Sequence, residues 1–296
     1  MKLSYKPVER GLWVRLMSPL GSYPANTFVT RSAAMVVTPE ICFSVVRVEK
    51  EDWSFSEADS LTLLEIPLLG SILLSVRSGE SYIYPYPTHQ ALLLETASKE
   101  DINDKCISEC KDFLLDILKK PELGTWPADQ IHRPPALGGN PYELVSDRHS
   151  DRDRRANLRQ LESAGPVVIR GVSSLIKAHM AWKHAEMGEA ACIFLWICLD
   201  AAHSLILQRL RETGVANPTS KDAVRYFEKI SGYSIEWEKF FEEDYENRIR
   251  AIHPDNRFGA EARPQFLADD FYELNDMLIP LFQFLVSPPA GGPVNP

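Results

Sequence analysis

Two side chains that could act on a phosphodiester lie close together in this sequence, at Arg248 and His253. A guanidinium stabilises the negative charge that develops on phosphorus, and an imidazole moves a proton near neutral pH, so the two together need no metal. The same segment adds one amide and further positive charge, from Asn247, Arg250, Arg257 and Arg263. The pair therefore suggests phosphoryl-transfer chemistry on a nucleic-acid backbone. The alternative is structural: both side chains end a helix and pair with neighbouring carboxylates.

The spacing of the pair depends on where the preceding helix ends. Apolar residues recur at intervals of three and four from 237 to 252, which predicts a helix beginning near Ser234. Residues five apart on a helix point about 140° away from each other. Pro254 disfavours helical geometry at His253, so we expect Arg248 to project from the last turns and His253 to lie at the exit.

The rest of the C-terminal half is predicted to be helical around this segment. Helices are expected over 172–185, 188–213, 221–230 and 265–286, with Gly214 as the residue that ends the second and Pro280 inside the last. The helix over 188–213 is apolar nearly all round, which is typical of a bundle centre or a subunit interface. Its Asp200 and His203, three residues apart, are interpreted either as a satisfied buried pair or as support for the Arg248–His253 pair.

The first part of the chain is rich in short β-favouring runs separated by Pro and Gly turns. Strands are expected over 13–16, 27–30, 41–48, 61–66, 72–76 and 82–84, without an assignable register. A helix over 98–120 follows, with Ser98 as its N-cap and one apolar stripe. The prediction is an α+β protein. Its β-rich domain with a closing helix covers 1–125, a Pro/Gly-rich and charged linker 126–164, an all-α bundle of four to five helices 165–287, and a flexible tail 288–296.

Composition limits the class of protein and its surroundings. A net charge of −9 argues against wholesale wrapping of nucleic acid, although a local basic site remains compatible with it. The five cysteines lack Cys-x-x-Cys spacing and are interpreted as reduced core thiols, which favours a cytoplasmic location. His179 and His184 with two nearby glutamates do not form a defensible metal site and are expected at the surface. We expect no metal, no cofactor and no membrane span.

The motif and the helices around it resemble the HEPN domain superfamily (higher eukaryotes and prokaryotes nucleotide-binding). The matching residues are Arg248-Ile-Arg-Ala-Ile-His253, placed just before the last predicted helix, and the resemblance covers roughly 165–287. Where the family commonly has a polar residue after the arginine, this chain has Ile249 and carries Asn247 before it. The resemblance implies a homodimer that cuts RNA without a metal at a site shared by two copies. It implies a toxin-like or antiviral (abortive-infection) effector.

Two other interpretations stay open. In one, the helical half is a non-catalytic HEPN module that dimerises or binds a nucleotide or a protein. In the other, the chain is a ligand-binding regulatory protein whose helical half mediates assembly. In each case the N-terminal domain is expected to act as a sensor with an unknown ligand or protein trigger.

Overall fold

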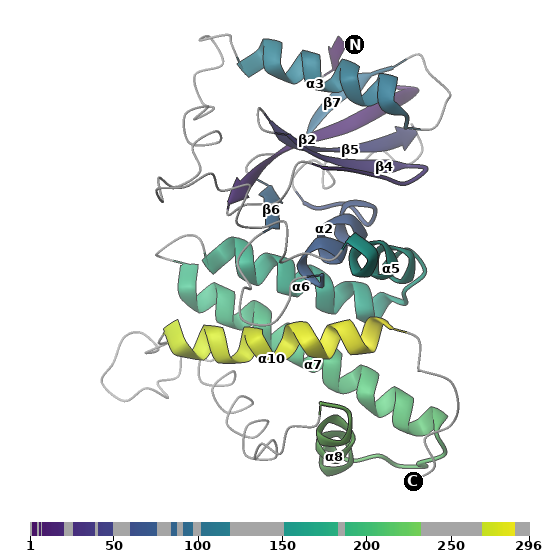
Figure 1. Ribbon diagram of the computed structural model, residues 1–296, viewed down its shortest axis with the longest axis vertical. Helices are drawn as coiled ribbons and strands as arrows, with labels where there is room; N and C mark the ends of the chain where they lie inside the picture. Colours follow the sequence, from purple (N-terminus) through teal and green to yellow (C-terminus); the bar gives the residue numbers. More distant parts are fainter. Residues whose placement is uncertain are drawn as a thin grey trace. The chain divides into compact units, whose positions relative to one another are not determined.

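The computed structural model divides the chain into an N-terminal unit, Met1–Arg154, and a C-terminal unit, Arg155–Pro296. It describes residues 2–4, 6, 8–20, 26–38, 41–49, 60–75, 84–87, 91–96, 102–118, 151–182, 187–231 and 268–287. The described part of the N-terminal unit is built on an antiparallel sheet, and that of the C-terminal unit is helical (Figure 1). The predicted α+β class is confirmed.

The sheet of the N-terminal unit is organised around its longest strand, β2. The described strands are β1 (Lys2–Ser4), β2 (Arg10–Leu20), β3 (Asn26–Val29), β4 (Ala33–Val37), β5 (Cys42–Glu49), β6 (Tyr84–Pro87) and β7 (Leu92–Glu95). Their order is β1-β7-β2-β5-β4-β3, with every described pair antiparallel. Strand β2 pairs with β5 along one edge, while β7 and then β6 pair with successive parts of the other edge.

Two threonines close the turns that join β3 to β4 and β4 to β5. The Oγ1 of Thr30 donates to the carbonyl of Ala33 (3.1 Å) and accepts from its N–H (3.0 Å). Thr38 makes the same two bonds with Ile41, at 2.8 and 3.1 Å. Each short polar side chain thus satisfies both backbone groups across its turn and holds the register of the strands that follow.

Both faces of the sheet are buried, which explains the imperfect alternation of its strands. On β2, one set of side chains packs in a core with α3 (Asp104–Leu118), and this set is Leu12, Val14 and Leu16. The intervening set, Trp13, Arg15 and Met17, is also buried. Helix α3 covers one face of the sheet and α2 lies at the other (Figure 1). A strand covered on both sides needs apolar residues at nearly every position, so its period of two is lost.

Helix α2 (Glu65–Leu73) replaces two predicted strands. The sequence predicts strands over 61–66 and 72–76, but 65–73 is one helix in which every residue is buried. Reciprocal bonds close the turn before it: Thr62 N–H donates to Glu65 Oε2 (2.8 Å), and Glu65 N–H donates to Thr62 Oγ1 (3.1 Å). The prediction was wrong because a short apolar run does not distinguish a buried strand from a buried helix. Strands β1, β4 and β7 were not predicted.

Helix α3 keeps its predicted apolar stripe but starts later than expected. Ile102, Cys110 and Leu114 are buried in the core against the sheet, and Ile117 is also buried. The Oδ1 of Asn103 caps the start of the helix by accepting the N–H of Cys106 at 2.9 Å. Ser98 lies outside the described residues.

Part of the predicted linker is a helix. Residues 119–150 lie outside the described residues, but α5 (Asp151–Glu162) is regular from its first residue. The charged run at its start is exposed at 152, 153 and 155, whereas Arg154 is buried, with its guanidinium 3.4 Å from the ring centroid of Phe28. A guanidinium stacks well on an aromatic face, which accounts for one buried charge within an otherwise exposed run.

The C-terminal unit contains α6 (Pro166–Trp182), α7 (Gly188–Glu212), α8 (Ser220–Ser231) and α10 (Ala268–Val286) among its described residues. Helices α6 and α7 pack together along their lengths, and α10 packs on both. Gly214 adopts a φ of 99° after α7, as its predicted place at the helix end requires. The predicted helix over 234–252 and the tail 288–296 lie outside the described residues.

Among the described residues, α7 is the one helix whose length and composition would allow it to cross a membrane. Half of its most apolar stretch is buried inside the protein. Its inner face includes Cys192, Leu195, Cys198 and Ala202. The predicted burial of this helix is therefore observed for one face and not all round.

Arg209 of α7 holds the C-terminal end of α10. Its Nη2 donates to the carbonyls of Leu285 (2.6 Å) and Ser287 (3.1 Å), and its guanidinium lies 4.9 Å from the ring centroid of Phe284. The last carbonyls of a helix lack partners within the helix, and a cation there also interacts favourably with the negative end of the helix dipole.

We expect Arg209→Ala to lower the free energy of unfolding by about 2 kcal/mol, because charge-assisted bonds to partly buried carbonyls are lost. Denaturant unfolding measures this effect. Arg211→Ala is the matched control, since Arg211 is exposed in the same last turn of α7, and it should change stability by less than about 0.5 kcal/mol. Equal effects of the two substitutions would contradict the assignment.

Candidate functional site

The residues predicted to carry chemistry fall between two described helices. Helix α8 ends at Ser231 and α10 begins at Ala268. Arg248 and His253, together with Asn247, Arg250, Arg257 and Arg263, lie in the intervening sequence, outside the described residues. What the structure describes is the set of helices on either side of this segment in the sequence.

The start of α8 is fixed by a reciprocal cap. Thr219 N–H donates to Asp222 Oδ2 (2.8 Å), and Asp222 N–H donates to Thr219 Oγ1 (3.3 Å). The Oγ1 of Thr219 also donates to Oδ2 of Asp222 (2.7 Å). The hydrogen bonds that Thr219 donates, backbone first and then side chain, lower the pKa of the Asp222 carboxyl. The predicted start of this helix near 217–221 is confirmed.

The crossing of α6 and α10 depends on a glycine. A Cβ placed on Gly171 of α6 would lie 2.3 Å from Cζ of Phe282 and 3.1 Å from the Cβ of Ala201. Phe282 is fully buried. The missing side chain at Gly171 therefore lets the phenyl ring of α10 lie directly on the backbone of α6.

A buried polar contact also joins α6 to α10, about two helical turns from this crossing. The Nε2 of His179 lies 2.7 Å from Oδ1 of Asn275, and both side chains are buried. Because an amide oxygen only accepts, His179 carries a proton on Nε2. The Nδ2 of Asn275 donates to Asp276 Oδ1 (3.3 Å), which fixes the amide orientation.

The position of His179 corrects the expectation that it lies at the surface. Its exposed fraction is 1%. Its ring meets the ring of Phe271 edge-on, with centroids 5.9 Å apart. The ring of Trp182 stacks on the same Phe271 ring, with centroids 4.2 Å apart. Glu189 is exposed, while His184 and Glu186 lie outside the described residues. Burial among aromatic rings makes His179 a packing residue of the helical core and not a surface ligand.

Asp200 and His203 lie on α7, but they do not form the buried pair that one interpretation required. Asp200 is exposed and His203 is half-buried. Burial lowers the pKa of the His203 imidazole, and the negative charge of Asp200 offsets this only in part. The two side chains thus interact electrostatically at the edge of the helix.

This environment predicts a pH effect of defined sign. The folded-state pKa of His203 lies below its ordinary value of 6.5, so the unfolded chain binds the proton more readily. The stability that His203 contributes is present above 6.5 and is lost as pH falls through the folded-state pKa. An NMR titration should place the His203 midpoint below 6.5, and Asp200→Asn should lower it further. A midpoint that rises in Asp200→Asn would contradict this account.

The described residues contain no cluster of side chains suited to bind a metal ion. Within the part of the chain that the structure describes, no three His, Cys, Asp or Glu side chains gather into a group that could hold a metal ion. The cysteines Cys42, Cys106, Cys110, Cys192 and Cys198 are all free thiols.

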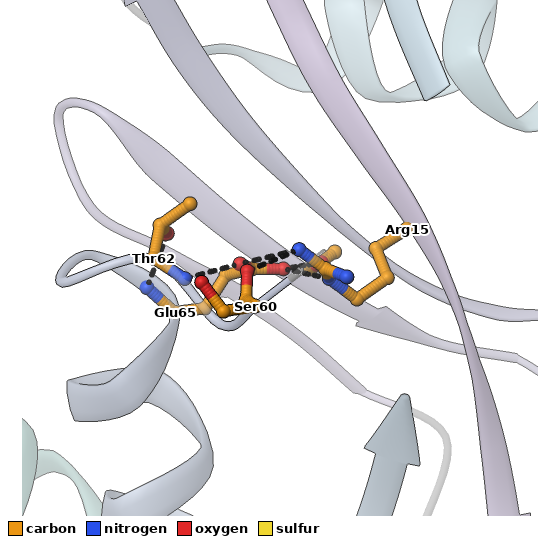
Figure 2. Close-up of polar contacts among 5 residues, drawn as sticks. Arg15, Ser60, Thr62 and Glu65 are labelled. Carbon is orange, nitrogen blue, oxygen red and sulfur yellow. Dashed lines mark hydrogen bonds and ion pairs between the residues drawn. The ribbon is translucent and has the colours of Figure 1, made fainter. Parts of the chain in front are cut away.

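The strongest polar cluster of the N-terminal unit was not predicted from the sequence. Arg15 of β2 and Glu65 of α2 form an ion pair with Nε and Oε1 3.0 Å apart, and their side chains are 3% and 1% exposed. Figure 2 shows Arg15 pointing at the turn that carries Ser60, Thr62 and Glu65. Ser44 of β5 donates to the same Oε1 at 2.6 Å.

The partners of this cluster indicate a structural role. The Glu65 carboxylate accepts from Arg15, Ser44 and the Thr62 N–H, while Arg15 Nη2 donates to the carbonyl of Ser60 at 2.7 Å. Both carboxylate oxygens are thus occupied by the protein itself. The cluster ties the turn before α2 to the face of the sheet and leaves no acceptor free for a substrate.

Comparison with known proteins adds no relative to this description. No family model matches the sequence, and no significant match was found among curated proteins or solved structures.

Proposed function

We propose that the chain is a metal-independent endoribonuclease of HEPN type, with Arg248 and His253 as its catalytic residues. The observation that carries the proposal is the place of this pair in the sequence. It follows the packed α6–α7 hairpin and α8, and it precedes α10, which packs on both helices of the hairpin. A helical hairpin, then the Arg–His motif, then a closing helix is the arrangement that the family resemblance implies.

The proposed reaction is an internal transesterification of RNA. The ribose 2′-oxygen attacks the adjacent phosphorus as His253 accepts its proton, and Arg248 stabilises the charge on the phosphorane. The bond to the 5′-oxygen then breaks, and that oxygen takes up a proton. The products are a 2′,3′-cyclic phosphate and a 5′-hydroxyl, and the balance needs no water, metal or redox partner.

Other residues of the segment and the core support this chemistry. Arg250, Arg257 and Arg263 supply local positive charge for the phosphates of RNA in a chain whose net charge is −9. Asn247 supplies an amide for hydrogen bonding. Asp200 and His203 serve as support from α7, where the apolar helix is partly exposed.

The proposal includes an assembly and a setting. Two copies pair through the helical unit and bring two motifs into one shared site. The free thiols fit a reducing compartment, here the cytoplasm. The N-terminal unit acts as the sensor of a toxin-like or antiviral effector, and its trigger is a small ligand or a protein.

Purified full-length protein incubated with single-stranded RNA in EDTA tests the proposal. We expect cleavage by the wild type that is lost in both Arg248→Ala and His253→Ala. Cleavage that is indifferent to both substitutions would refute the assignment of the site. Absence of cleavage, with growth arrest on expression that His253→Ala does not relieve, would favour the non-catalytic HEPN module.

A further inference from the structure

Helix α3 carries two thiols on one side of its axis. Cys106 and Cys110 are four residues apart within Asp104–Leu118, so they are neighbours on the helix surface. Cys110 is completely buried in the core against the sheet, whereas Cys106 packs at the margin of that core and is partly exposed. The two thiols are hydrogen-bonded to each other. One cysteine is therefore partly exposed, and its partner lies one helical turn further along α3 in the core.

The positive charge of Arg47 acts on the outer thiol of the pair, Cys106. Arg47 is on β5 two residues beyond Val45, which faces α3, so it belongs to the same face of the sheet. Its Nε is buried and makes no hydrogen bond among the described contacts. Glu109 adds an opposing negative charge. A partly exposed thiol beside a guanidinium is the setting in which cysteines become reactive.

The pKa values of the two thiols are shifted in opposite directions. The hydrogen bond from Cys110 and then the charge of Arg47 lower the pKa of Cys106, against the effects of burial and Glu109. The same hydrogen bond and burial raise the pKa of Cys110. Cys106 is thus the more acidic thiol of the pair and Cys110 the less acidic one.

We propose that Cys106 and Cys110 form a redox-active dithiol whose oxidant is a hydroperoxide. The Cys106 sulfur attacks the peroxide oxygen and becomes a sulfenic acid, and the peroxide leaves as water or alcohol. The Cys110 sulfur then attacks the sulfenic sulfur, a disulfide forms, and the sulfenic oxygen leaves as water with the Cys110 proton. Each turnover thus converts two thiols and one hydroperoxide to one disulfide, one water and one water or alcohol.

Helix geometry allows this bond and gives it a structural consequence. Residues four apart on a helix have Cα atoms about 6.2 Å apart, within the range of about 4.4–6.8 Å found for disulfides. Their Cβ atoms are about 5–6 Å apart, which exceeds the usual 3.5–4.5 Å. Closing the bond therefore requires the turn between them to adjust. That turn carries Ile107, which is buried against the sheet, so oxidation changes the packing of α3.

The other three cysteines do not share this arrangement. Cys42, Cys192 and Cys198 are buried, and burial raises the pKa of the Cys42 and Cys198 thiols. They serve as internal references in the same molecule. The proposal concerns the N-terminal unit alone and does not depend on the ribonuclease.

Mass spectrometry of the full-length protein treated with hydrogen peroxide tests the proposal. Trypsin releases Cys106–Lys111 as one peptide, and cleavage after Glu109 then splits it between the two cysteines. We expect this peptide to lose two hydrogens, its halves to stay joined until reduction, and the three reference cysteines to stay unmodified. Oxidation spread evenly over all five cysteines, or conversion of Cys106 to the sulfinic acid without a disulfide, would overturn the proposal.

Two matched variants separate the dithiol from a merely accessible thiol. In Cys110→Ser, Cys106 should accumulate as a sulfenic acid that dimedone traps, and wild type should show little adduct.

Arg47→Met should slow iodoacetamide alkylation of Cys106 by about threefold to tenfold. Arg10→Met is the control because Arg10 pairs with Glu49 at 3.4 Å on the same sheet. Equal rates in Arg47→Met and wild type, with unchanged circular dichroism, would remove the role of Arg47.

Discussion

Replacing His253 by alanine is expected to lower the rate constant of RNA cleavage by about 10²–10⁴-fold, because the proton of the attacking 2′-hydroxyl loses its acceptor. Arg248→Ala is expected to lower it by about 10²–10³-fold, since the phosphorane loses its charge partner. Single-turnover cleavage of a labelled RNA in EDTA measures both effects. The double variant should be hardly slower than His253→Ala, because the two groups act in one step.

The controls for this prediction are residues of the same type elsewhere in the chain. His149→Ala should cleave at the wild-type rate, since His149 lies outside the motif. Arg257→Ala should weaken RNA binding and its dependence on salt more than it slows the bound reaction. A slow His149 variant together with an active His253 variant would refute the assignment of the base.

Replacing Glu65 by alanine is expected to lower the free energy of unfolding of the N-terminal unit by about 3–5 kcal/mol. The substitution leaves the Arg15 guanidinium, which is 3% exposed, without its carboxylate. It also removes the acceptor of Ser44 and of the Thr62 N–H. Denaturant unfolding followed by near-ultraviolet circular dichroism measures the loss.

A much more exposed ion pair, between β2 and β5, is the matched control. Arg10 and Glu49 lie 3.4 Å apart with side chains 35% and 41% exposed, so Glu49→Ala should cost less than about 1 kcal/mol. The double variant Arg15→Met/Glu65→Leu should recover most of the loss, because the penalty comes from a charge left unpaired. A single Glu65→Ala variant as stable as Glu49→Ala would contradict the structural role of the cluster.

The helices of the C-terminal unit could be predicted because their signals are local. The end of α7 at Gly214 depends on one residue that tolerates positive φ. The start of α8 depends on Thr219 and Asp222, which are three residues apart. The buried face of α10 follows from apolar spacing alone.

The N-terminal unit was less predictable because its sheet is covered on both faces. Trp13 and Val14 are buried on opposite sides of β2, so apolar residues no longer mark one face. Helix α2 is a short apolar segment that is buried on every side, and such a segment does not distinguish a buried helix from a buried strand. The local sequence pattern predicted a β-rich unit, but it did not predict correctly which of its apolar segments are strands.

The polar contacts that matter most join residues far apart in the sequence. Arg15 and Glu65 are 50 positions apart, and His179 and Asn275 are 96 apart. No spacing rule connects such partners, so His179 was expected at the surface. The Arg248–His253 pair is a local motif that sequence reasoning can find, and its role stays a prediction because it lies outside the described residues.

The chemistry of the cleaved ends tests the central claim most directly. The wild type in EDTA should leave a 2′,3′-cyclic phosphate and a 5′-hydroxyl on RNA, and a substrate with 2′-deoxyribose at the cleaved position should remain intact. His253→Ala should yield neither product. Cleavage of the deoxy substrate, or products carrying a 5′-phosphate, would show that the nucleophile is not the 2′-hydroxyl and would contradict the account.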